Sequence, residues 1–287
     1  IIAEYGTDAL RFSLISITSQ GQDVYLSKDR FEQGRNFVNK IWNASRFILT
    51  NLKPEDVNVD LCVFFKREQL DIVNRWILSR FYTTLEKVGK ELDNFKFNEA
   101  ANSLYAFFWH EFCDWYLELI KPQIGQKQTQ IVMYKVLEKY LRLIHPFMPF
   151  ISEEIWQRLP GAKDSIMQQN WPHLQSELMN KQDELQMELA FEVINVIRNM
   201  RAELEVNPAS RIDIQISAMS KLTQKSLEQL LSYIKNLAKV NNLTLTEKYI
   251  AQNNQYAVVF KDLHIVMPLE GAAHAADGYA RASGKVG

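Results

Sequence analysis

The chain has only two cysteines among its 287 residues. Cys62 and Cys113 lie far apart in the sequence and do not form the spacing of a metal site. We therefore expect neither a disulfide framework nor a zinc centre. Two isolated cysteines are typical of reduced structural thiols, which predicts a cytoplasmic protein.

Long apolar runs are absent as well. No run of about 18 apolar residues occurs, so we expect no membrane-spanning helix and no membrane partner. No basic segment leads into an apolar stretch with a small-residue cleavage site, so no secretory signal peptide is visible. The sequence starts at Ile1 without a methionine, and we expect it to be a fragment of a longer chain.

An excess of charge of one sign is also missing, because 33 basic residues face 34 acidic ones. Non-specific affinity for nucleic acid grows with the number of phosphates neutralised, so binding over the whole surface is not expected. A nucleic-acid reader with this balance must concentrate positive charge locally. Residues 28–46 do so, with five basic and two acidic residues. An ordinary solvated helix face remains the alternative.

Residue patterns that carry catalysis are not found. The sequence contains neither a Gly-rich phosphate loop nor a His-x-Gly-His segment for ATP. Its five histidines form no metal or triad spacing. The adjacent carboxylates Glu153 and Glu154 are typical of favourable charge at the start of a helix. We therefore expect no catalytic residue, no metal and no cofactor in this chain.

Helical periodicity dominates up to about residue 205, and prolines bound the helical segments. We expect helices over residues 27–52, 68–92, 98–120, 129–145 and 176–204, with a short one from residue 152. Long helices joined by short turns predict a bundle.

Beyond residue 205 the period changes to that of strands. Residues 211–216 alternate between apolar and polar side chains. Further strands are predicted near residues 243–246, 257–260 and 265–267, with a helix near 223–238. The predicted fold class is therefore mainly α, a helical bundle followed by a small α/β module.

Residues 35–49 divide into two faces when placed on a helix at about 100° per residue. One arc holds three cations, three asparagines and no carboxylate: Arg35, Asn36, Asn39, Lys40, Asn43 and Arg46. The opposite side is apolar and includes Phe37, Ile41, Trp42 and Ile48. Asparagine is a poor helix former, but its donor and acceptor can reach base edges while arginine and lysine contact phosphates.

Phe47 falls inside the polar arc, where an unpaired base could stack on its ring. Packing of Phe47 against a neighbouring helix is the alternative. With Phe47, the candidate RNA-binding set has seven members.

Several segments together resemble the valyl-tRNA synthetase family. Residues 5–12 are similar to the segment after the signature lysine loop of class I aminoacyl-tRNA synthetases, and residues 35–47 to the family's first anticodon-domain helix. Later segments are similar to further bundle helices and a Pro-broken junction: residues 75–80, 97–118, 145–156, 171–172 and 197–203. The resemblance covers about residues 1–271.

The resemblance implies an anticodon-binding region that recognises tRNA(Val) as part of a monomer. A catalytic domain before residue 1 would use ATP to join valine to the tRNA. Four segments are then expected: a linker that contacts the tRNA stem (1–26), the anticodon-binding bundle (27–172), a helix with a small α/β module (173–271), and a tail (272–287).

Three alternatives stay open. Isoleucyl-tRNA synthetases share the early and Pro-broken segments but lack the asparagine-rich helix, which favours valine. A helical scaffold without an RNA function is the second. The third is a thiamine-diphosphate enzyme, because residues 271–287 resemble a segment of acetolactate synthases. There a glutamate stands where this chain has Leu269, and so short a segment cannot supply the whole domains of a thiamine enzyme. A junction near Gly271 is the simplest account.

Residues 218–222 imitate the Lys-Met-Ser-Lys-Ser loop of class I synthetases. They lack its first lysine and last serine. The family places that loop just before residue 5, so we do not take residues 218–222 as catalytic.

Overall fold

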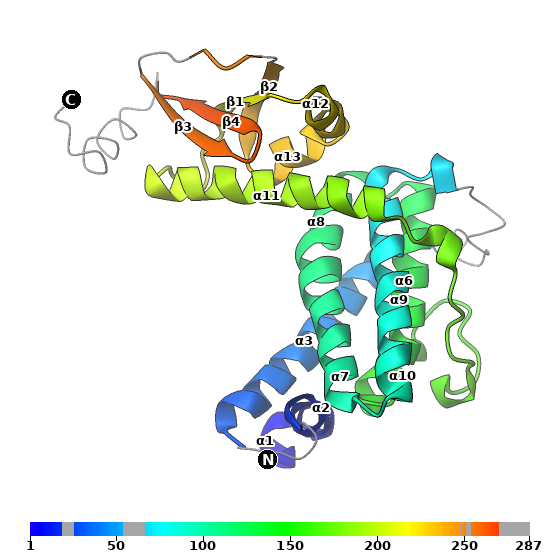
Figure 1. Ribbon diagram of the computed structural model, residues 1–287. Coiled ribbons are helices and arrows are strands. Elements are labelled where there is room, and N and C mark those ends of the chain that lie inside the picture. The colour runs from blue at the N-terminus through cyan, green and yellow to red at the C-terminus, as the bar shows by residue number, and fades with distance from the viewer. Residues whose placement is uncertain (19–25, 54–66, 247, 251–253, 270–287) are drawn as a thin grey trace. The chain divides into compact units, whose positions relative to one another are not determined.

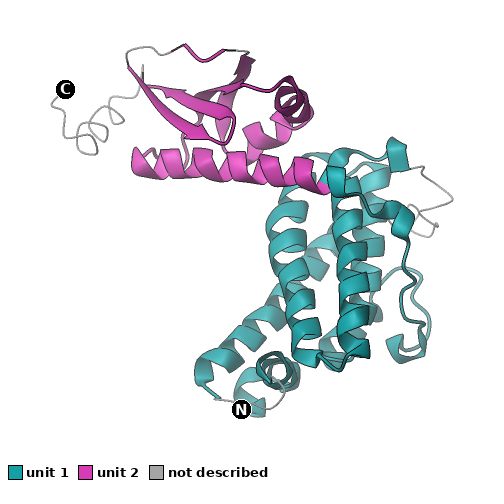
Figure 2. Cartoon of the chain, in the orientation of Figure 1, with its two compact units in different colours: residues 1–183 teal, residues 184–287 magenta. Residues whose placement is uncertain are grey.

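Each segment in which the sequence predicts a helix is helical in the computed structural model, which describes residues 1–18, 26–53, 67–246, 248–250 and 254–269 (Figure 1). The chain divides into two units, residues 1–183 and 184–287 (Figure 2). Helices form the first unit, and the second holds a four-stranded sheet. The predicted fold class is thus confirmed. The tail at 272–287 lies outside the described residues, and the four expected segment bounds stay predictions.

The α-helices of the first unit are α1 (Ile2–Tyr5), α2 (Thr7–Ile17), α3 (Lys28–Asn51), α6 (Ile72–Asp93), α7 (Phe97–Ala106), α8 (Leu117–Ile120), α9 (Lys127–Ile144) and α10 (Pro149–Trp156). Between α7 and α8 the chain continues as the π-helix η2 (Phe107–Tyr116). Short 3-10 turns are η1 (Arg67–Gln69), η3 (Lys121–Gln123), η4 (Ile166–Gln168) and η5 (Ser176–Leu178). Helix α11 (Lys181–Glu203) begins at the end of this unit and continues into the second.

Side chains form hydrogen bonds with free backbone groups at the start of α6 and at the end of α3. Asp71 caps α6 by accepting hydrogen bonds from the backbone N–H groups of Val73 and Asn74, both at 2.9 Å. Gln130 of α9 holds the end of α3, donating to the carbonyl of Asn51 at 2.9 Å and accepting from the N–H of Lys53 at 2.8 Å. Ser27 stands at the N-cap of α3, but its side chain makes no capping hydrogen bond.

Aromatic side chains of the η2 segment form the centre of the bundle. Phe108, Phe112 and Tyr116 are fully buried and are spaced four residues apart. In this column the rings of Phe108 and Phe112 are tilted with centroids 5.3 Å apart, and those of Phe112 and Tyr116 stack with centroids 5.5 Å apart. Phe108 also stacks on Tyr140 of α9 at 4.4 Å, so the column fixes η2 against α9.

Helices α2 and α3 approach closely at Gly34. A Cβ atom added there would lie 2.6 Å from the carbonyl oxygen of Ala9 and would also collide with the Ser13 hydroxyl. That hydroxyl donates to the carbonyl of Arg30 at 2.8 Å, which keeps it in place. Only glycine fits this crossing without a shift of backbone.

Two of the segments recognised in the sequence meet in space. Asp8 of α2 is buried and accepts hydrogen bonds from the first N–H groups of α10, at 2.6 Å from Ile151 and 3.3 Å from Phe150. Arg11 donates to the carbonyl of Pro146 at 3.0 Å. These bonds fasten α2 to the Pro-broken junction, and the carboxylate also interacts well with the start of α10.

The second unit is a mixed sheet with strand order β2-β1-β4-β3. Its strands are β1 (Ile212–Ala218), β2 (Val240–Thr246), β3 (Gln255–Phe260) and β4 (Leu263–Pro268). Strand β1 runs parallel to β2 and antiparallel to β4. Helices α12 (Lys221–Glu228) and α13 (Leu231–Leu237) form the crossover between the parallel strands, as such pairs require.

The segment that imitates a catalytic loop has a structural role. Ser220 caps α12 by accepting a hydrogen bond from the N–H of Leu222 at 3.2 Å. Lys221 is exposed in the first turn of that helix. Among the described residues, no helix is both long and apolar enough to cross a membrane.

Replacing Gly34 by alanine is expected to destabilise the protein by about 1–3 kcal/mol, because the new methyl group overpacks the α2–α3 crossing. Gly89, on α6, is the matched control, since a Cβ there meets nothing within 4 Å. Gly89→Ala should be neutral or stabilising by up to about 1 kcal/mol. Urea unfolding of both variants measures the difference, and equal stability of the two would contradict the close packing at Gly34.

Burial lowers the pKa of His145, whose Nδ1 lies 2.7 Å from the Ser152 hydroxyl, and the nearby Arg11 lowers it further against Glu153 and Asp8. The unfolded chain takes up this proton near pH 6.5, whereas the folded protein binds it only at lower pH. The free energy of unfolding should therefore fall as the pH drops below about 6.5. His145→Gln should lose less stability than the natural chain between pH 7 and pH 5.5 in urea titrations. Identical losses of stability in the two proteins would show that His145 does not contribute to the pH dependence.

Candidate nucleic-acid interface

One side of α3 is fixed in the core of the first unit. Phe37, Ile41 and Ile48 are fully buried on that side. The Phe37 ring contacts those of Phe12 and Tyr105, with centroids 4.9 Å and 4.8 Å away. Because these contacts set the rotation of the helix, the opposite side must face outward.

The outward side carries four of the predicted residues in one line. Asn36, Asn39, Asn43 and Arg46 are all exposed, at alternating spacings of three and four residues, and we call them the asparagine stripe. None of the four side chains has a hydrogen bond, ion pair or ring contact to any other residue that the structure describes. Their donors and acceptors are therefore available to a ligand.

Arg35 and Lys40 flank the stripe, but each already has partners. Arg35 forms an ion pair with Glu32 at 3.1 Å, and its guanidinium lies 5.4 Å from the centre of the Tyr5 ring. Lys40 forms one with Asp114 of η2 at 2.8 Å. These pairs are partly exposed, so each contributes little stability and can be exchanged for a phosphate contact.

Asp114 changes the electrostatics that the sequence predicts. The polar arc of α3 has no carboxylate of its own, yet the fold brings this one from η2 beside Lys40. The Lys40 ammonium also lies 5.0 Å from the centre of the Trp109 ring, a cation–π contact that further occupies it. Arg46 is thus the cation of the predicted set that is left without a partner in the described structure.

Phe47 is half-buried at the edge of the stripe. Its ring has no aromatic or cation–π partner among the described residues. Its carbonyl accepts a hydrogen bond from the Asn51 side chain at 2.8 Å, within the last turn of α3. The ring is therefore neither a full member of the core nor a free platform.

Trp42 is not in the core, contrary to its place on the apolar side of the helical wheel. It is half-exposed, and the guanidinium of Arg158 lies 4.8 Å from the centre of its ring. Together these side chains border a cavity of about 260 Å³ whose other walls are Ser45, Arg46, Leu49, Thr50 and Ile155. The reason is that α10 covers only part of this side of α3.

Arg158 was missed by the sequence analysis. It adds a cation beside Arg46, although its Nε also donates to Glu154 at 3.0 Å. No pattern in α3 could reveal it, because the residue comes from a segment more than a hundred positions away and is placed by tertiary packing.

No cluster that could hold a metal ion was found among the described residues. Cys113 is buried, and burial raises the pKa of its thiol to about 12. A thiol in that state is neutral and unreactive at neutral pH. The groups that the candidate site on α3 presents are therefore hydrogen-bond donors and acceptors, cations and an aromatic ring.

Residues 74–216 match the family described as "Anticodon-binding domain of tRNA ligase". Among curated proteins, the chain is 42% identical over 282 residues to the valine--tRNA ligase of Syntrophotalea carbinolica and 41% identical over 280 residues to that of Geobacter sulfurreducens. It is 34% identical over 278 residues to the valine--tRNA ligase of Bacillus cereus. Each of these alignments covers 94% of this chain and 31% of the relative.

Among solved structures, a leucyl-tRNA synthetase of Agrobacterium radiobacter in a ternary complex aligns with a TM-score of 0.46 and 19% identity. That alignment covers 62% of this chain and 21% of the other. The chain spans about a third of the length of its curated relatives. With 34–42% identity along 94% of its own length, and with the anticodon-binding domain match over residues 74–216, the chain corresponds to the anticodon-binding region of the valine--tRNA ligases that it matches.

Proposed function

We propose that the first unit binds the anticodon part of tRNA(Val) and orients the tRNA for a valine–tRNA ligase. In this proposal the whole enzyme uses ATP to join valine to the tRNA, in a domain outside this chain. The chain itself contributes recognition and holds no cofactor. The whole enzyme acts as a monomer in the cytoplasm.

The asparagine stripe is the observation that carries the proposal. Asparagine is costly in a helix, and three of them stand exposed on α3 without any partner in the described structure. A helix face that served only solubility would be more stable with glutamate, lysine and glutamine, which are better helix formers. Helix α3 lies before the residues that match the anticodon-binding domain and packs on that domain through Phe37 and Phe108, whose ring centroids are 6.3 Å apart.

Each kind of side chain can contact a different part of the RNA. Asn39 and Asn43 offer a donor and an acceptor each, which can pair with the edge of an unstacked base. Arg46 supplies a free cation for a phosphate, and Arg35 and Lys40 can join it by leaving Glu32 and Asp114. Phe47 presents part of a ring on which a loop base can stack.

The alternatives are weaker. The relatives named above are valine--tRNA ligases, which favours valine over isoleucine as the amino acid of the whole enzyme. A scaffold without an RNA function would leave the unpaired stripe without a reason. The thiamine alternative depends on residues 271–287, which lie outside the described structure.

Replacing Arg46 by alanine should weaken tRNA binding and lower the slope of log affinity against log salt by roughly 0.7–0.9, because one phosphate contact is lost. Lys87→Ala is the control, since it removes an exposed cation of α6 that is already paired with Glu91. Filter binding between 50 and 200 mM salt measures both slopes. Equal slopes for the two variants would argue against Arg46 as a phosphate contact.

Replacing Asn39 or Asn43 by alanine should reduce discrimination between tRNA(Val) and other tRNAs by roughly 1–3 kcal/mol for a good base contact. Because both side chains are exposed, the free energy of unfolding should change by less than about 0.5 kcal/mol. Ile41→Ala, on the buried side, should instead cost about 2–5 kcal/mol of stability. Unchanged affinity and specificity in both asparagine variants would remove the stripe from the recognition site.

The chain alone should not form valyl-adenylate, because the sequence contains no ATP-binding signature and Lys221 lies in a helix turn. Valine-dependent pyrophosphate exchange measures this activity, with a reaction lacking protein as the control. Exchange above that background would show that the chemistry lies within these 287 residues.

A further inference from the structure

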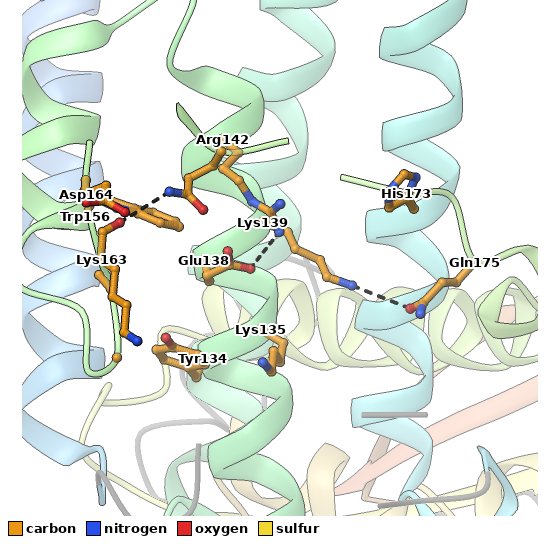
Figure 3. Close-up of a pocket in the computed structure, with 13 residues that line it drawn as sticks. Tyr134, Lys135, Glu138, Lys139, Arg142, Trp156, Lys163, Asp164, His173 and Gln175 are labelled. Atoms are coloured by element: carbon orange, nitrogen blue, oxygen red, sulfur yellow. Dashed lines mark hydrogen bonds and ion pairs between the residues drawn. The ribbon is translucent and has the colours of Figure 1, made fainter. Parts of the chain in front are cut away.

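A second basic site lies in the first unit, on α9 rather than on α3. Helix α9 and the chain from Trp156 to Gln175 border a cleft of about 750 Å³, which we call the α9 cleft (Figure 3). Lys135, Lys139 and Arg142 line it from α9, and Lys163 from the other wall. The three α9 residues share one helix face, because they are four and three positions apart.

The lining of this cleft is positively charged. Its four lysine and arginine side chains face two carboxylates, those of Glu138 and Asp164. Glu138 is already paired with Arg142 at 2.9 Å. The whole chain carries a net charge of −1, so this is a local concentration of positive charge in a concave surface, where the electric field is focused.

Two of the four cations are free to meet a ligand. Lys139 is occupied, because it donates to the Tyr82 hydroxyl and lies 3.5 Å from the Gln175 side-chain oxygen. The side-chain ammonium groups of Lys135 and Lys163 form no hydrogen bond or ion pair with any described residue. The Lys135 ammonium is 5.5 Å from the centre of the Tyr134 ring, and Figure 3 shows Lys163 on the chain to the left of α9, with Tyr134 drawn between Lys163 and Lys135.

The walls are fixed by bonds that do not involve these two lysines. Arg142 donates to the carbonyl of Asn170 at 2.8 Å, and the Tyr134 hydroxyl donates to that of Pro160 at 2.7 Å. The Trp156 indole donates to the carbonyl of Asp164 at 3.3 Å. The cleft is therefore formed before any ligand binds, which lowers the entropic cost of binding.

A neighbouring cleft of similar size shows that the charge is not a property of clefts in general. It has a volume of about 650 Å³ and is bordered by α6 and residues 170–174. Lys90 faces two carboxylates there, Glu86 and Asp93, and is paired with the former at 2.9 Å. Of the two clefts, the α9 cleft is the one with an excess of unpaired ammonium groups.

We propose that the α9 cleft binds phosphate groups through Lys135 and Lys163, and that an RNA backbone supplies them. An ammonium is a point charge without the fixed fork of arginine, so it suits a backbone phosphate whose orientation varies. The cleft lies inside residues 74–216, the part that matches the anticodon-binding domain. The RNA source rests on the proposed function, whereas the phosphate chemistry rests on the cleft alone.

The first experiment tests the phosphate chemistry with inorganic tripolyphosphate. Calorimetry at low salt compares the full chain, the double variant Lys135→Ala/Lys163→Ala and the control Lys87→Ala/Lys121→Ala. The control removes two exposed lysines outside the cleft, so the net charge changes equally. We expect binding to the full chain and the control, and loss of binding in the cleft variant. Equal binding by both variants would overturn the site.

The second experiment tests the RNA source with tRNA(Val) and the same three proteins. The cleft variant should lose roughly 0.7–0.9 of salt slope per lysine, and the control should keep the slope of the full chain. A cleft variant that loses tripolyphosphate but keeps its tRNA slope would overturn the RNA source. If the full chain binds no tRNA at all, the proposed function fails, while the tripolyphosphate result still decides whether the cleft is a phosphate site.

Discussion

The burial of Phe37 is the constraint on which the recognition surface depends. Its ring is fully buried and contacts aromatic rings from α2, α7 and η2. A helix with one large side chain held on several sides cannot rotate about its axis. Gly34, one turn earlier, lets α2 close over the same side. The outward direction of the asparagine stripe is therefore a consequence of apolar packing on the other side of α3.

Some basic side chains of the first unit are paired with carboxylates within the fold, and others have no such partner among the described residues. Arg75 and Arg67 both reach the buried Asp183, and Arg80 pairs with Glu111 at 2.6 Å. These cations are neutralised within the fold and offer little to an outside anion. Free cations such as Arg46, Lys135 and Lys163 can attract phosphate although the whole chain is nearly neutral. Net charge alone would hide this difference.

The sequence predicts most of the fold because its signals are local. Periodicity, prolines and the change of period near residue 205 gave helices and strands close to those observed. The side of α3 that carries Asn36, Asn39 and Asn43 also follows from spacing alone. Trp42 lies on the apolar side of the helical wheel but is only half-buried, because a wheel shows which residues share a side and not how far the neighbouring helix extends over it.

The parts of the candidate sites that could not be predicted all come from distant segments. Asp114 reaches α3 from η2, Arg158 reaches it from the turn after α10, and Lys163 lines the α9 cleft from a loop. None of these pairings leaves a periodic pattern, so each needs the tertiary fold. A sequence can thus indicate a binding face more readily than the charges that surround it.

The hydrogen bonds of Asp8 extend the role of α2 beyond packing. They join α2 to the start of α10, while the chain just after α10 carries Arg158 to the ring of Trp42 on α3. Burial raises the pKa of the Asp8 carboxyl, and the N–H groups of Ile151 and Phe150 oppose that shift. Three of the segments that resemble the family, at residues 5–12, 35–47 and 145–156, are therefore parts of one packed corner. Its rigidity gives the stripe a fixed position relative to α2, and a reader of RNA needs such a fixed frame to tell one base from another.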